Sequence, residues 1–262
     1  MTAPRSAHLD LDVDGSVATL RLARPEVRNA LSVELLEDLV AACAWLGTRP
    51  EVRVVVLTGA GEHFCAGADV STMSALLAEG SDARRAAGAG DRAATSLESL
   101  DAFTIAAIRG RCVGGGVVLA LACDLRVAQT TARFSIPEVD LGIPLAWGGI
   151  PRLLREVPPA VARELVLTCR EFDAEEAARL GLLSRVVAPG ELTGSVAQLA
   201  QELAAKAQLP VRATLDAVRV AVGIGTPQGW SDADSLLTAV RDPECRAAAQ
   251  AYLTRVFGAA DG

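Results

Sequence analysis

The sequence predicts an α/β protein whose parallel strands alternate with helices and give way to a helical C-terminal region. Two β-branched runs, at residues 52–58 and 104–108, each lead into a glycine-rich turn and then a helical segment. Short apolar runs of this kind are typical of strands buried in a parallel sheet. After residue 190 only helical periodicity remains. We therefore expect a core domain over residues 1–190 and a helical region over residues 191–262.

The N-terminal segment predicts a β-hairpin followed by a capped helix. Residues 9–13 and 17–22 alternate between apolar and polar side chains around Asp14-Gly15, which is a strong hairpin signal. Ser32 precedes a run with helical apolar spacing and is expected to be its N-cap. Residues 79–90 are small, polar and interrupted by glycine, which predicts either a poorly specified helix or a mobile loop beside the site.

The C-terminal region carries its own helix signals. Asp173 and Glu176 form a D-x-x-E capping box before a short helix that Gly181 ends. Further helices are expected over residues 191–206 and 211–222, and a last one begins at Asp242-Pro243 and reaches about residue 257.

Composition excludes several classes of protein. With 262 residues, 51% of them hydrophobic, the chain can bury a sizeable core and is not disordered. Its net charge of −7 offers no electrostatic footprint for nucleic acid or an anionic membrane surface. No apolar stretch is long enough to span a bilayer and no secretory leader is visible, so we expect a cytoplasmic protein.

The cysteines and histidines indicate neither disulfides nor a metal. The six cysteines form no C-x-x-C pair, and a chain of this size does not need disulfide bonds, so free thiols are expected. Cys65 is expected to be a packing thiol rather than a nucleophile. The only histidines, His8 and His63, lack the spacing of a zinc site, and we predict no metal.

Two glycine-rich turns are the strongest functional signal. The sequence FCAGAD at residues 64–69 and the triplet GGG at residues 114–116 each follow a predicted buried strand. Such turns leave backbone N–H groups without intrahelical partners. Two N–H groups from separate turns could converge on one developing negative charge, which is the arrangement of an oxyanion hole.

The sequence motifs around these turns resemble those of one family. They are RPEVRNAL at residues 24–31, GAGEHFCAGAD at 59–69, GGG at 114–116 and SIPEVDLG at 135–142, with a glycine pair at 148–149. Taken in this order, they resemble the crotonase (enoyl-CoA hydratase/isomerase) superfamily. The resemblance implies a crotonase-type spiral of ββα units and an acyl-CoA thioester substrate of the fatty-acid oxidation type. It also implies no cofactor beyond the CoA carried by the substrate, and a homotrimer or dimer of trimers in which the C-terminal helices assemble the subunits or cover an active site.

The resemblance also assigns site residues. Ala68 and Gly115 would donate the two oxyanion-hole hydrogen bonds, and Glu138 would be the acid/base. The path of the CoA and acyl groups would be lined by Arg28, Ala30, Ala66, Asp69, Val70, Gly114, Val118 and Trp147, the last of which would shape the acyl pocket. Judged by residue type alone, Arg28 could instead be a solvated surface charge, Asp69 a helix cap and Glu138 an ordinary exposed glutamate.

Val118 departs from the family pattern. The family's first acidic residue would fall at this position, and hydration of an enoyl-CoA uses two carboxylates, so losing one is expected to cost about 10²- to 10⁴-fold in rate. One base suffices to take a proton from C2 of a 3-enoyl-CoA and return it at C4. The sequence therefore favours isomerisation of 3-enoyl-CoA to 2-enoyl-CoA. Two alternatives remain: a hydratase whose second acid is replaced, for example by Asp140, and a non-catalytic acyl-CoA-binding protein.

Overall fold

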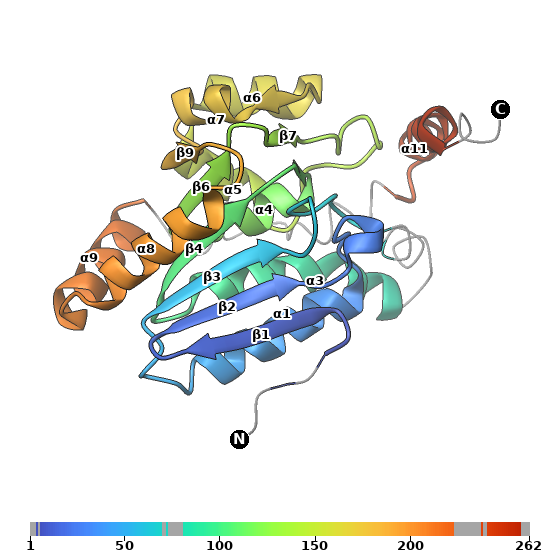
Figure 1. Ribbon diagram of the computed structural model, residues 1–262. Coiled ribbons are helices and arrows are strands. Elements are labelled where there is room, and N and C mark those ends of the chain that lie inside the picture. The colour runs from blue at the N-terminus through green and yellow to red at the C-terminus, as the bar shows by residue number, and fades with distance from the viewer. Residues whose placement is uncertain are drawn as a thin grey trace.

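A six-stranded sheet lies at the centre of the molecule (Figure 1). The computed structural model describes residues 4, 6–69, 72, 81–222, 237 and 240–257. The strands are ordered β1-β2-β3-β4-β6-β9, and only β1 and β2 pair in antiparallel fashion. Their bounds are Leu9–Asp14, Val17–Leu22, Val54–Gly59, Phe103–Ile108, Leu125–Gln129 and Arg185–Val187. The predicted parallel α/β core is confirmed.

A smaller sheet lies beside the first. It has the order β5-β7-β8, with bounds Arg111–Val113, Arg133–Ser135 and Phe172–Asp173. Its first two strands run parallel. Because β5 leads into one of the glycine turns and β7 leads toward Glu138, this small sheet brings those two segments together.

The predicted N-terminal hairpin is confirmed. Leu9 pairs with Leu22 at the open end, and Gly15 in the turn has a φ of +57°, a conformation that glycine adopts without steric cost. The β-branched run at residues 52–58 becomes β3, whose residues are all buried between β2 and β4.

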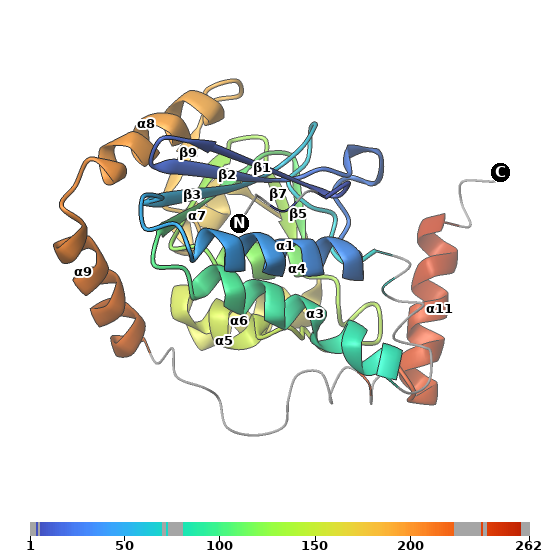
Figure 2. The same ribbon diagram turned by 90° about the horizontal axis from the view of Figure 1, so that it is seen from below.

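Helices cover both faces of the large sheet. Helices α1 (Val33–Leu46) and α3 (Ser81–Glu98) pack on one face, and α8 (Leu192–Ala204) packs on the other (Figure 2). Leu199 of α8 belongs to one buried cluster with Val54 of β3 and Ile105 of β4. The first helix beyond residue 190 is thus part of the packing of the core, and the division of the chain at that residue stays a prediction.

The other helices are short or lie outside these layers. Their bounds are Pro25–Val27 (the 3-10 helix η1), Gly115–Leu121 (α4), Gly149–Glu156 (α5), Pro159–Thr168 (α6), Ala174–Arg179 (α7), Gln208–Ala221 (α9) and Pro243–Phe257 (α11). Helices α9 and α11 extend away from the core on opposite sides (Figures 1 and 2). Backbone atoms of Cys245 at the start of α11 nevertheless pack against Gly142, in the loop that follows Glu138.

The predicted helix caps are largely confirmed. The Ser32 hydroxyl accepts a hydrogen bond from the Leu35 N–H at 3.2 Å, and the Asp173 carboxylate accepts one from the Glu176 N–H at 2.8 Å. The capping box is only half formed, because the Glu176 carboxylate turns away and binds Arg170. Residues 81–90 are the start of α3, so the helical alternative holds for that part of the glycine-interrupted segment; residues 79 and 80 lie outside the described residues.

The six cysteines are free thiols, as predicted. Burial raises the pKa of Cys65 to about 12, which fits a packing thiol and not a nucleophile. No helix within the described ranges is both long enough and apolar enough to cross a membrane.

Candidate active site

The two glycine turns lie side by side. Cys65 forms a parallel β-bridge with Cys112, which lies one residue before the end of β5. The Val113 N–H donates to the Cys65 carbonyl at 3.0 Å. Gly67 has a φ of +91°, and a Cβ there would lie 3.1 Å from the Val113 carbonyl oxygen and 3.9 Å from the Gly115 nitrogen. A side chain at residue 67 would therefore separate the two turns.

Two N–H groups at this junction have no acceptor among the residues that the structure describes. Leu31 donates to the Gly67 carbonyl at 2.8 Å and accepts from the Asp69 N–H at 3.0 Å, so the Ala68 N–H points to the other side of its segment. Gly115 is the first residue of α4, where an N–H has no intrahelical partner. Neither N–H donates a hydrogen bond to any residue that the structure describes. The junction thus offers two free donors.

Glu138 lies buried against the second turn. Its carboxylate packs on Gly114, whose φ is +51° and where a Cβ would overlap the carboxylate oxygen Oε1. The residue is 9% exposed, and its Oε2 has no hydrogen-bond partner within the described part of the chain. Burial raises the pKa of the carboxyl from 4.5 to about 7, because a charge is poorly solvated there. The alternative of an ordinary exposed glutamate is wrong.

Val118 supplies no second carboxylate beside Glu138, because its side chain is apolar. It is 1% exposed inside α4, whose residues are all buried, and one of its methyl groups packs against Gly149 of α5. Asp140, the candidate replacement acid, is exposed. Asp69 is bound to Arg24, whose Nη1 donates to its carboxylate at 2.6 Å.

Asn29 organises the turn at residues 24–31, a role that the sequence analysis did not assign. Its side chain is fully buried; Nδ2 donates to the carbonyls of Ala60 and His63, both at 2.9 Å, and Oδ1 accepts from the Arg24 N–H at 3.0 Å. The RNAL motif gave no signal for this role, because the bonded carbonyls lie more than thirty residues away in the sequence.

The residues predicted to line the CoA path fall into separate environments. Arg28 is exposed, and its carbonyl accepts from the Ala66 N–H at 3.0 Å, so the two residues are neighbours. The Ala30 carbonyl accepts from the Arg24 guanidinium at 2.6 Å. Both readings of Arg28, as a CoA contact or as a surface charge, stay open. Val70 lies outside the described residues.

The buried Trp147 completes the wall around Gly115. The residue is 5% exposed, and a Cβ on Gly115 would overlap its six-membered ring. The structure thus brings Ala68, Gly114, Gly115, Glu138 and Trp147 to one place. No group of three or more potential metal ligands from His, Cys, Asp and Glu occurs in the described part of the chain.

Comparisons with known proteins agree with this geometry. The family model described as enoyl-CoA hydratase/isomerase matches residues 12–255. The chain is 37% identical over 210 residues to a short-chain-enoyl-CoA hydratase from Clostridium acetobutylicum, covering 79% of each chain. It is 38% identical over 214 residues to a peroxisomal Delta(3,5)-Delta(2,4)-dienoyl-CoA isomerase from Arabidopsis thaliana, covering 78% of this chain and 77% of that one.

A solved structure extends the agreement to the fold. An enoyl-CoA hydratase/carnithine racemase from Magnetospirillum magneticum superposes with a TM-score of 0.79 at 31% identity, covering 88% of this chain and 85% of that one. The sheet order, the paired glycine turns and these similarities together identify the crotonase fold, and the chain belongs to the enoyl-CoA hydratase/isomerase family.

Proposed function

We propose that this protein isomerises 3-enoyl-CoA thioesters to 2-enoyl-CoA thioesters, with Glu138 as the single base. The N–H groups of Ala68 and Gly115 form the oxyanion hole. The observation that carries the proposal is a buried carboxyl with an unbonded oxygen and a raised pKa beside two free N–H donors, while the position of a second acid is filled by Val118. A base whose pKa lies close to neutrality is well matched to proton transfer at physiological pH.

The reaction needs only one proton carrier. Glu138 removes a proton from C2, and the electron pair of that C–H bond delocalises over C1 to C4 and onto the thioester oxygen. The two N–H donors stabilise the resulting dienolate, and losing one such donor typically costs about 10²- to 10³-fold in rate. The protonated Glu138 then returns the proton at C4, which leaves the double bond between C2 and C3. No atoms are gained or lost.

A hydratase is the second candidate, because relatives such as the protein from Clostridium acetobutylicum are named hydratases. Hydration would require a second acid to act with Glu138. Asp140, the replacement acid that the sequence suggested, is at the surface. Asp69, another carboxylate near the glycine turns, is bound to Arg24. These environments favour the isomerase.

The test is turnover of 3-hexenoyl-CoA and of crotonyl-CoA by the purified protein and by its Glu138→Gln variant. We expect the wild type to convert the 3-enoyl substrate and the variant to lose at least about 10²-fold in kcat. Asp140→Asn, which changes an exposed carboxylate two residues away, is the matched control and should keep full activity. Rapid hydration of crotonyl-CoA would instead establish the hydratase. Binding of an acyl-CoA without turnover of either substrate would establish a non-catalytic binder.

The remaining expectations are also part of this proposal. The reaction requires no cofactor beyond the CoA of its substrate and no nucleic acid or membrane partner, and we place it in the cytoplasm. We further propose that the chain assembles as a homotrimer or a dimer of trimers. The exposed apolar side chains of α9, Val218 among them, support this assembly because that helix projects from the core (Figure 2).

A further inference from the structure

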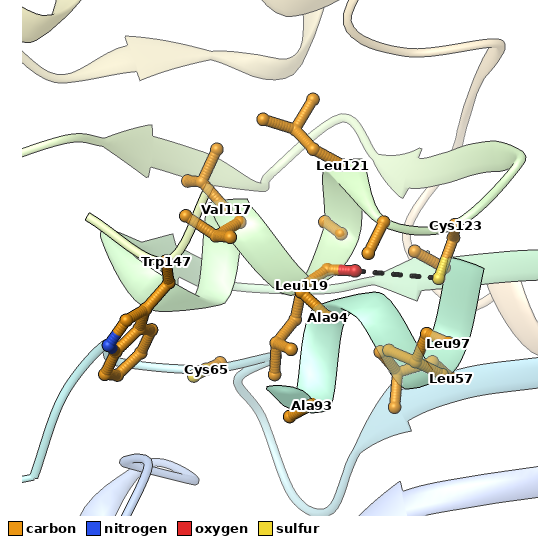
Figure 3. Close-up of a cluster of buried hydrophobic side chains, with 14 of the residues drawn as sticks. Leu57, Cys65, Ala93, Ala94, Leu97, Val117, Leu119, Leu121, Cys123 and Trp147 are labelled. Atoms are coloured by element: carbon orange, nitrogen blue, oxygen red, sulfur yellow. Dashed lines mark hydrogen bonds between the residues drawn. The ribbon is translucent and has the colours of Figure 1, made fainter. Parts of the chain in front are cut away.

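The indole of Trp147 is clamped between glycines of two different helices. A Cβ on Gly90 of α3 would overlap the bond shared by the two rings, and a Cβ on Gly115 of α4 would overlap the edge of the six-membered ring. Trp147 lies at the edge of the buried side-chain cluster in Figure 3. Any side chain at either glycine would displace the indole.

Trp147 occupies this position at a cost to stability. Its φ is +57°, a conformation that bulky residues rarely adopt. Its Nε1 is buried and has no hydrogen-bond partner in the described ranges, which is unfavourable for a polar group out of contact with water. Gly90 also weakens the helix that contains it. Unfavourable local conformations persist where the surrounding structure enforces them, and they concentrate at functional sites.

A buried arginine holds the backbone of Trp147 in this conformation. Arg152 of α5 is 4% exposed, and its Nη1 donates to the Trp147 carbonyl at 2.6 Å. Its Nη2 donates to Glu98 of α3 at 2.6 Å and to the Thr95 hydroxyl at 3.2 Å. The same guanidinium therefore fixes the residue that carries the indole and the helix that packs on its other side.

We propose that Trp147 determines which acyl groups the enzyme accepts, and that Arg152 is its positioning residue. This rests on the proposed function, in which the thioester oxygen lies at Gly115. The acyl atoms next to the thioester must then pass the indole edge that touches Gly115. On this proposal, the rigid ring excludes acyl groups that are bulky close to C3, and the enzyme accepts narrow, unbranched enoyl chains.

Binding of unreactive saturated thioesters tests the proposal separately from catalysis. The dissociation constants of hexanoyl-CoA and 3-phenylpropanoyl-CoA are measured by titration calorimetry for each variant. We expect the wild type to prefer hexanoyl-CoA, and Trp147→Ala to reduce that preference by roughly tenfold or more, within the range by which apolar pockets discriminate small differences in size. Trp147→Phe, a smaller change with less risk to folding, should reduce it in the same direction.

Two controls separate selection from general damage. Trp45→Ala removes a partly buried tryptophan on α1, and should leave the preference unchanged. Arg126 is 5% exposed and binds Glu156 and two carbonyls, so Arg126→Met, like Arg152→Met, removes a buried guanidinium that binds a carboxylate and the backbone. Only Arg152→Met should reduce the preference for hexanoyl-CoA.

The outcomes are distinct. A preference that stays within twofold of the wild type in both Trp147 variants would overturn the proposal, as would equal loss of preference in the two arginine variants. Glu138→Gln should keep the preference. If that variant also kept its turnover, the proposed chemistry would be wrong while the assignment of Trp147 would stand on its binding data.

Discussion

At the scale of single residues, the burial of Glu138, the proposed base, has a cost to folding. Its pKa is raised from 4.5 to about 7 by burial, so between these pH values the folded protein retains a proton that the unfolded chain releases. The contribution of this carboxyl therefore lowers the free energy of unfolding as pH rises through that window. The size is of order 3 kcal/mol, since one pH unit corresponds to about 1.4 kcal/mol.

This predicts that Glu138→Gln loses less stability than the wild type between pH 5 and pH 8. Urea unfolding at both pH values measures the difference, with Asp140→Asn as the control that should follow the wild type. Identical pH dependence of the wild type and the Gln variant would contradict it. The proposed isomerase activity should change in the opposite sense and rise with pH through about 7, because only the ionised carboxylate could accept a proton from C2.

The glycine under Glu138 allows a second prediction. Gly114→Ala should abolish activity, because the new methyl group would overlap the Glu138 carboxylate. The alanine would also have to adopt a φ of +51°, which is unfavourable for a residue with a side chain. Gly15→Ala is the control: its φ of +57° is similar, but nothing lies within 4 Å of the added methyl group. We expect that variant to keep full activity and to lose only about 1 kcal/mol of folding stability. Thermal unfolding and turnover of 3-hexenoyl-CoA measure both, and an active Gly114→Ala enzyme would show that the carboxylate does not need this position.

At the scale of elements, the turn at residues 24–31 is expected to lose more stability on substitution than a helix cap does. Asn29→Ala removes the partners of two carbonyls and of the Arg24 N–H, at a site where φ is +58°. We expect a loss of about 3 kcal/mol or more, since each buried group left unpaired costs about 1–3 kcal/mol. Ser32→Ala removes one capping bond on α1 and should cost about 1 kcal/mol. Chemical denaturation of both variants measures these losses of folding stability. Equal losses in the two variants would count against the role of Asn29 in organising the turn.

At the scale of the whole molecule, α8 and α9 are expected to respond differently to substitution. Leu199 of α8 is 5% exposed against the sheet, so Leu199→Ala should cost about 2–5 kcal/mol of folding stability. Val218 of α9 is 53% exposed, so Val218→Asp should change folding stability by less than about 0.5 kcal/mol while weakening subunit association. Thermal unfolding and sedimentation equilibrium measure the two effects. An unchanged sedimentation mass for Val218→Asp would remove this face from the proposed assembly.

The sequence by itself determined the local elements and the composition of the site. The hairpin, the caps at Ser32 and Asp173 and the buried strands follow from periodicity and from side chains that bond within a few residues, so a short window of sequence contains their cause. The glycine turns were visible in the same way, since each lies directly after a predicted buried strand. Glu138 was proposed only because its sequence context resembles that of a known family, since by residue type alone it would be an exposed glutamate.

Only the tertiary structure decided how these parts support one another. The bond from Asn29 to Ala60, the pairing of Arg24 with Asp69 and that of Arg152 with Glu98 join residues 31, 45 and 54 positions apart. Gly90 only weakens a helix when the sequence is considered alone, whereas in the fold it makes space for the indole of Trp147. Such contacts depend on where folding brings distant segments together, and no local pattern encodes that distance in space.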